Sequence, residues 1–169
     1  YKRQLLRTFY SKLPEDLIIK TIYKRKPTKT KSLEKEFIIE KGFLNLKNNS
    51  PKNLQLKWAN VFEKSLEHNL LIHPRFLKTV EEKRKVLKKT TDKQHLQSFL
   101  NIVVSKKNPI QALHDFNDTQ LFSEIFPEFG RVWGQVQFDI YHHYTTDEHL
   151  LLTLHNLNCL LYTSPSPRD

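Results

Sequence analysis

The sequence has little of several residue types that other classes of protein depend on. It has one cysteine, Cys159, which excludes an internal disulfide and a cysteine metal cluster. It has three glycines, too few for a glycine-rich nucleotide loop, and it contains neither a nucleophile elbow nor a phosphate-loop motif. Because neither of these motifs is present, any phosphate chemistry in this chain would depend on metal ions. No apolar run approaches the roughly 18 residues that a membrane span needs.

Methionine is also absent, and the chain begins with Tyr1. We therefore expect an internal piece of a longer protein. No signal-peptide pattern is present, and a cytoplasmic location is the simplest interpretation. The ending CLLYTSPSPRD (159–169) breaks the amphipathic pattern and has no potential to form a core. We expect it to be a disordered or artefactual, non-native tail that resembles a translated sequencing adapter.

Charge is divided unevenly along the chain, whose net charge is +10. Residues 1–107 carry 26 Lys and Arg against 10 Asp and Glu, whereas residues 108–169 carry 2 against 8. A basic region can bind nucleic acid or an acidic protein. Lysines such as Lys83, Lys85, Lys88 and Lys89 are scattered around apolar positions without aromatic platforms, which favours a solvated face. A basic helical module that binds nucleic acid or protein remains one alternative.

Hydrophobic periodicity predicts a mainly α fold, a helical bundle with one short β-hairpin. The hairpin is expected near residues 37–46 (FIIEKGFLNL), with its turn at positions 41–42. Helices are expected over 1–26, 52–71 and 75–90, from 92 onward, from 109 until a stop at Pro127, and from Asp147. In the last helix the residues expected to face inward are Leu150, Leu151, Leu154 and Leu157.

The segment 126–149 (FPEFGRVWGQVQFDIYHHYTTDEH) concentrates groups that bind metals. Imidazole binds divalent metals, and carboxylates act as further ligands or orient the histidines. The run Thr145-Thr146-Asp147 predicts a helix start, with His149 in the first turn, directed towards whatever packs there. Spacing alone also allows these histidines to cap or to hydrogen-bond within a helical core. The side chains in question are His142, His143, His149, Asp139, Asp147 and Glu148.

Four further histidines are predicted to be structural or at the surface. His68 and His73 flank a helix end and have no acid cluster nearby. His155 lies six residues after His149, which is off its helical face. The dipeptide His114-Asp115 looks like the metal-binding pair of certain phosphohydrolases, but it lies on an amphipathic helix and is not expected to bind metal.

The stretch 108–157 resembles the bifunctional uridylyltransferase/uridylyl-removing enzymes that act on the nitrogen-regulatory PII protein. The runs that carry the resemblance are FPEFGRVWGQVQFDIYH and YTTDEH. The family's typical form is Pro-x-Phe-Gly-Arg, Gly-Gln-x-Gln, Asp-x-x-His and Tyr-Thr-Val-Asp-Glu-His. Thr146 replaces the usual valine, and His143 falls on a variable position and is given no role. The resemblance implies a basic helical region at 1–107 after an absent nucleotidyltransferase domain, and the start of an HD-type phosphohydrolase domain at 108–158.

The resemblance also implies roles for individual residues. His149 matches the first histidine of the HD metal site, which would take Mg²⁺ or Mn²⁺. Asp139 and His142 match motif positions and would support the site, whereas Asp147 and Glu148 are not ligands in the family. The remaining ligands would lie beyond position 158, so no catalytic residue is assigned.

The implied reaction is metal-assisted hydrolysis of a uridylyl-tyrosyl phosphodiester. With an incomplete metal site, the chain is expected to be inactive alone. The implied partners are the PII protein, UTP and UMP, and glutamine bound by absent ACT domains. No membrane partner is expected, and nucleic acid is a disfavoured partner. A second alternative is another HD-type metal-dependent phosphohydrolase with an unrelated helical N-terminus.

Overall fold

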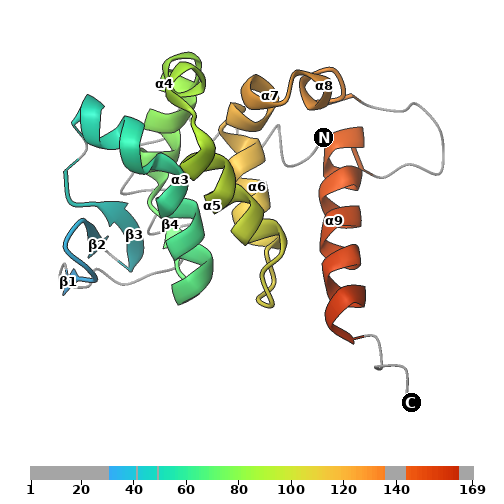
Figure 1. Cartoon of the computed structure of the whole chain (residues 1–169), viewed down its shortest axis with the longest axis horizontal. Coiled ribbons are helices and arrows are strands. Elements are labelled where there is room, and N and C mark those ends of the chain that lie inside the picture. The colour runs from blue at the N-terminus through green and yellow to red at the C-terminus, as the bar shows by residue number, and fades with distance from the viewer. Residues whose placement is uncertain (1–30, 41, 49, 136–143, 164–169) are drawn as a thin grey trace.

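The structure is a computed structural model, and it describes residues 31–40, 42–48, 50–135 and 144–163. In this part of the chain the predicted mainly α fold is confirmed. A small sheet lies at one end, α9 lies at the other, and the remaining helices lie between them (Figure 1). The elements are β1 (Lys31–Ser32), β2 (Phe37–Glu40), β3 (Phe43–Leu46), α3 (Pro51–His68), β4 (Leu71–Ile72), α4 (Pro74–Thr90), α5 (Lys93–Val103), α6 (Ile110–Asp118), α7 (Leu121–Ile125), α8 (Pro127–Gly130) and α9 (Thr146–Thr163).

The predicted hairpin is confirmed, and the sheet extends beyond it. Strands β2 and β3 pair antiparallel with Phe37 opposite Leu46, and Gly42 in the connecting turn has a φ of 80°. Two further strands were not predicted: β1 pairs antiparallel with β2, and β4 pairs parallel with β3. Each has only two residues, which is too short to produce an alternating pattern that a sequence would reveal.

Helix α3 begins at Pro51, is capped by Ser50, and ends earlier than predicted. The hydroxyl of Ser50 accepts a hydrogen bond from the backbone N–H of Asn53, and Pro51 occupies the first turn. The predicted end at residue 71 is wrong because Asn69 adopts a left-handed conformation with φ of 52°. Its N–H bonds back to carbonyl groups of the last turn, a common helix termination. The chain then turns into β4.

Both histidines at the α3–α4 connection have the structural or surface roles that were predicted. His73 is fully buried and caps α4, because its Nδ1 accepts a hydrogen bond from the backbone N–H of Arg75 at 3.2 Å. Its ring packs edge-on against Phe43. His68 is exposed, and its Nε2 lies 3.8 Å from a carboxylate oxygen of Glu34. Neither histidine lies near the candidate segment in the sequence.

Asp92 caps the start of α5, where the sequence predicts a helix start, and a buried histidine ties this helix to α3. Asp92 and His95 form a reciprocal capping box, and the backbone N–H of His95 holds the pKa of the Asp92 carboxyl below its ordinary value. On its other side, Nε2 of His95 lies 2.8 Å from the carbonyl oxygen of Gln55. The same ring stacks on Trp58 with centroids 5.1 Å apart. The cap of one helix is thus part of the contact with another.

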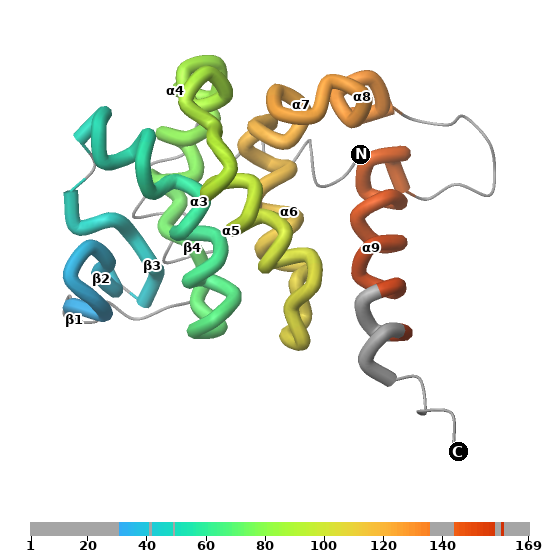
Figure 2. Tube along the Cα trace, viewed as in Figure 1, coloured from blue at the N-terminus to red at the C-terminus, as the bar shows by residue number. Residues whose placement is uncertain are grey.

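The hydrophobic core lies where α3, α5 and α6 run side by side (Figure 2). Trp58 is 1% exposed and lies between two rings, His95 on one side and Phe116 on the other. Aromatic contacts then extend towards α4 and α7 through Phe62, Phe76, Phe99 and Phe122. Such pairs add to the free energy gained by burying the rings.

The predicted stop before Pro127 is confirmed, since α7 ends at Ile125, but Pro127 also begins a further short helix, α8, that was not predicted. Proline fits the first turn of a helix, where its missing N–H has no partner to lose. Gly130 ends α8, and a Cβ atom there would lie 3.1 Å from the carbonyl oxygen of Ser123 in α7. The close approach of α7 and α8 therefore favours glycine at this position. Residues 131–134 form turns.

Helix α9 confirms the predicted start but not the predicted buried face. Leu151 is 1% exposed and Leu154 is half-buried, whereas Leu150 and Leu157 are 40% and 53% exposed. Among the described elements, this helix makes its main contacts with α5 and α6, so one narrow line of side chains is covered there. It continues to Thr163, into the segment expected to be a non-native tail.

Two other expectations concern charge and membranes. The four lysines of α4 named above are exposed, as expected for a solvated face, and Nζ of Lys88 lies 3.9 Å from a carboxylate oxygen of Glu124. None of the helices in the described ranges is both long enough and apolar enough to span a bilayer. The predicted helix over 1–26 lies outside the described residues.

Candidate functional site

The candidate segment is described at its two ends, residues 126–135 and 144–149. Asp139, His142 and His143 lie outside the described residues, so their predicted roles stay predictions. The second of these ends contains the start of α9, which packs against α6.

Asp147 is the buried centre of this geometry. Its side chain lies in the first turn of α9, and the residue is 2% exposed. One carboxylate oxygen accepts a hydrogen bond from Nδ2 of Asn117 in α6 at 2.9 Å, and the other accepts one from the backbone N–H of Gly134 at 3.0 Å. Asn117 is also 2% exposed. A buried carboxylate needs such donors, because burial without them is costly.

The backbone on either side of the undescribed segment 136–143 is joined at the same point. The N–H of Thr146 donates to the carbonyl oxygen of Gln135 at 3.0 Å, and its hydroxyl donates to the same oxygen at 3.3 Å. Gly134 has a φ of 67°, a conformation that glycine adopts without strain. Residues 134–135 and 146–147 therefore lie side by side. The first turn of α9 is held both by these residues and by Asn117 of α6.

His149 lies in this first turn, as predicted, and its backbone N–H donates to the carbonyl oxygen of Thr145 at 2.9 Å. The expectation that its side chain points towards packed neighbours is wrong, because the residue is exposed. An exposed imidazole on a well-held turn suits a divalent metal chemically. Within the described ranges, however, no three His, Cys, Asp or Glu side chains come together in a way that could hold a metal ion. The described residues thus offer one candidate ligand and not a complete site.

Helix α6 also contributes side chains to this geometry, which was not predicted from the sequence. His114 approaches the motif, with its Nδ1 3.3 Å from a carboxylate oxygen of Glu148. Its neighbour Asp115 accepts a hydrogen bond from Nε2 of Gln111 on the same helix, at 2.8 Å. The two side chains of this dipeptide therefore have different partners. The available signal for the contact with α9 was the spacing of Asn117, which lies three residues after His114 and therefore on the same side of α6.

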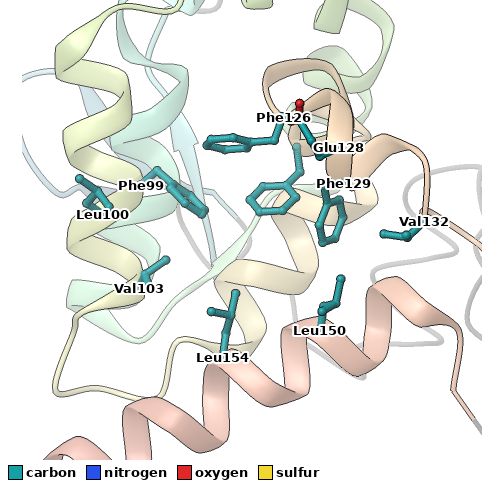
Figure 3. A pocket seen from close by; sticks show the side chains of 10 residues that line it. Phe99, Leu100, Val103, Phe126, Glu128, Phe129, Val132, Leu150 and Leu154 are labelled. Carbon is teal, nitrogen blue, oxygen red and sulfur yellow. The ribbon is translucent and has the colours of Figure 1, made fainter.

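An apolar groove of about 490 Å³ is lined by residues of α5, α7, α8 and α9 (Figure 3). Leu150 and Leu154 point into it from α9, towards Phe129 and Val103. Glu128 is the one charged residue among those that line it. The described lining of the groove is therefore almost entirely apolar, and the groove shows how little of α9 is packed against the other described helices.

Because so little of α9 is packed, we expect its docking to depend on Leu151. Leu151→Ala should cost about 2–4 kcal/mol, since the side chain is almost completely buried. Leu150→Ala, its exposed neighbour, is the matched control and should cost less than about 1 kcal/mol. Hydrogen exchange of the α9 amides and urea unfolding measure the two effects. Equal costs for the two variants would contradict the docking of α9 through Leu151.

Comparisons with known proteins agree with the predicted family. The chain is 37% identical over 97 residues to the bifunctional uridylyltransferase/uridylyl-removing enzyme of Rhodospirillum rubrum, a match that covers 57% of this chain. It is 31% identical over 121 residues, 70% of the chain, to the protein of that name from Azospirillum brasilense, and 32% identical over 105 residues to the one from Ruegeria pomeroyi. No family model matches the chain, and no solved structure matches it.

The matched stretch spans a small part of each relative, 10% of the Rhodospirillum protein and 13% of the Azospirillum protein. All three relatives carry the same enzyme name. The two ends of the candidate segment, which carry the Gly-Gln and Thr-Asp-Glu-His parts of the predicted motif, are those joined by hydrogen bonds in the structure. Over the matched stretch, the chain is therefore a homologue of the bifunctional uridylyltransferase/uridylyl-removing enzymes, the family that its sequence motifs predict.

Proposed function

We propose that this chain is the segment of a uridylyltransferase/uridylyl-removing enzyme that leads into, and begins, a metal-dependent HD-type domain that removes UMP from the PII protein. The observation that carries the proposal is the match to relatives that share this enzyme name. Residues 1–107 then belong to the helical region after a nucleotidyltransferase domain, and 108–158 begin the hydrolytic domain. The substrates and partners of the whole protein are UTP, PII and uridylylated PII, with glutamine as the regulatory ligand and the cytoplasm as its location.

His149 is the proposed metal ligand in this segment. Its position in the first turn of α9, its exposure and its imidazole chemistry support that role. A divalent ion such as Mg²⁺ or Mn²⁺, when bound, would polarise the phosphoryl oxygen and activate the attacking water. The chain's own contribution is to hold the imidazole on a helix start that is fixed by Asp147 and Thr146.

The isolated chain is proposed to be inactive, because one imidazole does not hold a catalytic ion. Isothermal titration of the 169-residue chain with Mn²⁺ should show no site-specific binding in the micromolar range. Micromolar binding that disappears in His149→Ala would contradict this part of the proposal, because it would show a complete site in the isolated chain.

The function itself is tested on the full-length protein that contains this segment. Incubation with UTP and PII should yield uridylylated PII, and a second incubation with Mn²⁺ should release UMP from it. Mass spectrometry of PII follows both steps. A protein that hydrolyses other phosphate esters but never modifies PII would instead support an unrelated HD-type phosphohydrolase. Binding to duplex DNA with a steep salt dependence would support the basic binding module.

A further inference from the structure

The buried pair Asn117–Asp147 links two elements that are far apart in the sequence. Asn117 lies near the C-terminal end of α6, and Asp147 lies in the first turn of α9. Each residue is 2% exposed, and the distance from Nδ2 to the carboxylate oxygen is 2.9 Å. A buried hydrogen bond to a carboxylate is among the stronger protein hydrogen bonds, and losing the donor leaves a buried charge without its partner.

The other hydrogen bonds of this turn also hold the start of α9 in place. Asp147 also receives the N–H of Gly134, and the backbone of Thr146 is bonded to Gln135. Two residues further on, His149 bonds through its own N–H to Thr145, which is 3% exposed. The imidazole of His149 therefore extends into solvent from a turn whose backbone is held on its inner side by buried groups.

We propose that Asn117 and Asp147 are positioning residues that set the direction of His149. The inference rests on the proposed function of His149 and adds to it one residue of α6, Asn117, and one residue of α9, Asp147. Neither residue needs to touch a ligand. Their effect is transmitted through the first turn of α9, where most of the other contacts come from backbone groups. Weak packing of α9 makes this polar contact more important, since Leu151 is the only buried apolar residue in the described part of the helix.

A donor–acceptor exchange tests the pair directly. Asn117→Asp places a second carboxylate at hydrogen-bond distance from Asp147, so two acceptors of like charge meet without a donor. Asp147→Asn should be mild, because its new amide keeps an oxygen for the Gly134 N–H and Asn117 has its own carbonyl oxygen to accept with. The double variant exchanges donor and acceptor and should restore the contact. Asn156→Ala, at an exposed asparagine of α9, is the control.

The readouts separate positioning from general stability. In the 169-residue chain, Asn117→Asp should speed hydrogen exchange of the His149 amide by about tenfold or more, and the double variant should reverse the change. In the full-length enzyme, Asn117→Asp should slow UMP removal by about 10- to 100-fold, as measured for residues that orient metal ligands, while UMP transfer stays within about twofold. The double variant should recover to within about threefold of the parent rate.

The outcomes distinguish this inference from the proposed function. If His149→Ala leaves UMP removal intact, the proposed function of His149 fails, whatever position 117 does. If His149→Ala abolishes removal while Asn117→Asp changes neither removal nor exchange, the positioning role is wrong. The positioning role is also wrong if the double variant restores neither hydrogen exchange nor UMP removal, because two residues in direct contact must respond to the exchange of donor and acceptor. This holds even if Asn117→Asp alone unfolds the chain.

Discussion

His149→Ala in the full-length enzyme is expected to abolish removal of UMP from PII and to spare transfer of UMP to PII. The loss should be at least about 10²-fold, because a catalytic divalent ion contributes several kcal/mol to the transition state and each 1.4 kcal/mol corresponds to tenfold in rate. Transfer should stay within about threefold, since His149 is proposed to belong to the hydrolytic domain alone. Rates of UMP release and of UTP-dependent modification, measured on the same preparation, give the two values.

His68→Ala is a suitable control for that experiment. His68 is also an exposed histidine on a helix, but it lies near the sheet and pairs with Glu34, away from α9. Its replacement should change neither activity by more than about twofold, in line with surface substitutions elsewhere. Equal loss of removal and transfer in His149→Ala would contradict the assignment, because it would indicate a general structural effect. A second check is the Mn²⁺ concentration that any residual removal requires, which should rise in His149→Ala because one proposed ligand is lost.

The sequence was sufficient to predict the elements that have strong local signals. The hairpin at 37–46 and the helix starts at Asp92 and near Asp147 each combine a turn or capping residue with a clear period. The strands of two residues and the helix begun by Pro127 had no such signal, because their existence depends on neighbours supplied by tertiary structure. Asn69 shows the same limit, since its left-handed conformation ends α3 inside a run that still looked helical.

Burial on α9 was harder to predict than its boundaries. Leu150, Leu151 and Leu157 have the same chemistry and fit one apolar pattern, yet only Leu151 is buried. The difference arises because α9 contacts few other elements among the described residues, so most of its apolar surface has no described neighbour. A periodic pattern shows which side chains are apolar, but it does not show how wide the covering surface is.

The sequence motif was sufficient to predict the position of His149, but not the contacts that hold its helix turn in place. His149 and the helix start came from the order of residues, since a threonine and an acid before a helix favour capping. The buried state of Asp147 and its bond to Asn117 join positions thirty residues apart. Such a contact follows from the packing of α6 against α9, which spacing along the chain does not reveal. The role of His114 beside Glu148 was missed for the same reason.

Trp58→Ala is expected to have the largest effect on stability. Trp58 is 1% exposed and its ring is stacked between His95 and Phe116, so alanine would leave a large cavity where α3, α5 and α6 meet. Substitutions of this kind cost about 3–5 kcal/mol. A small domain has about 5–15 kcal/mol of total stability, so the variant should be close to unfolding at 25 °C. Urea unfolding monitored by far-UV circular dichroism measures the loss.

Two matched variants keep this prediction informative even if Trp58→Ala does not fold. Trp58→Phe keeps an aromatic ring between the two neighbours and should cost about 1–3 kcal/mol, within the range of most single substitutions. Leu56→Ala, on the same helix but 52% exposed, should cost less than about 1 kcal/mol. Because the indole N–H of Trp58 is buried without a hydrogen-bond partner among the described residues, phenylalanine loses ring area but no hydrogen bond. A cost for Trp58→Ala as small as that of Leu56→Ala would mean that the three helices do not meet at this ring.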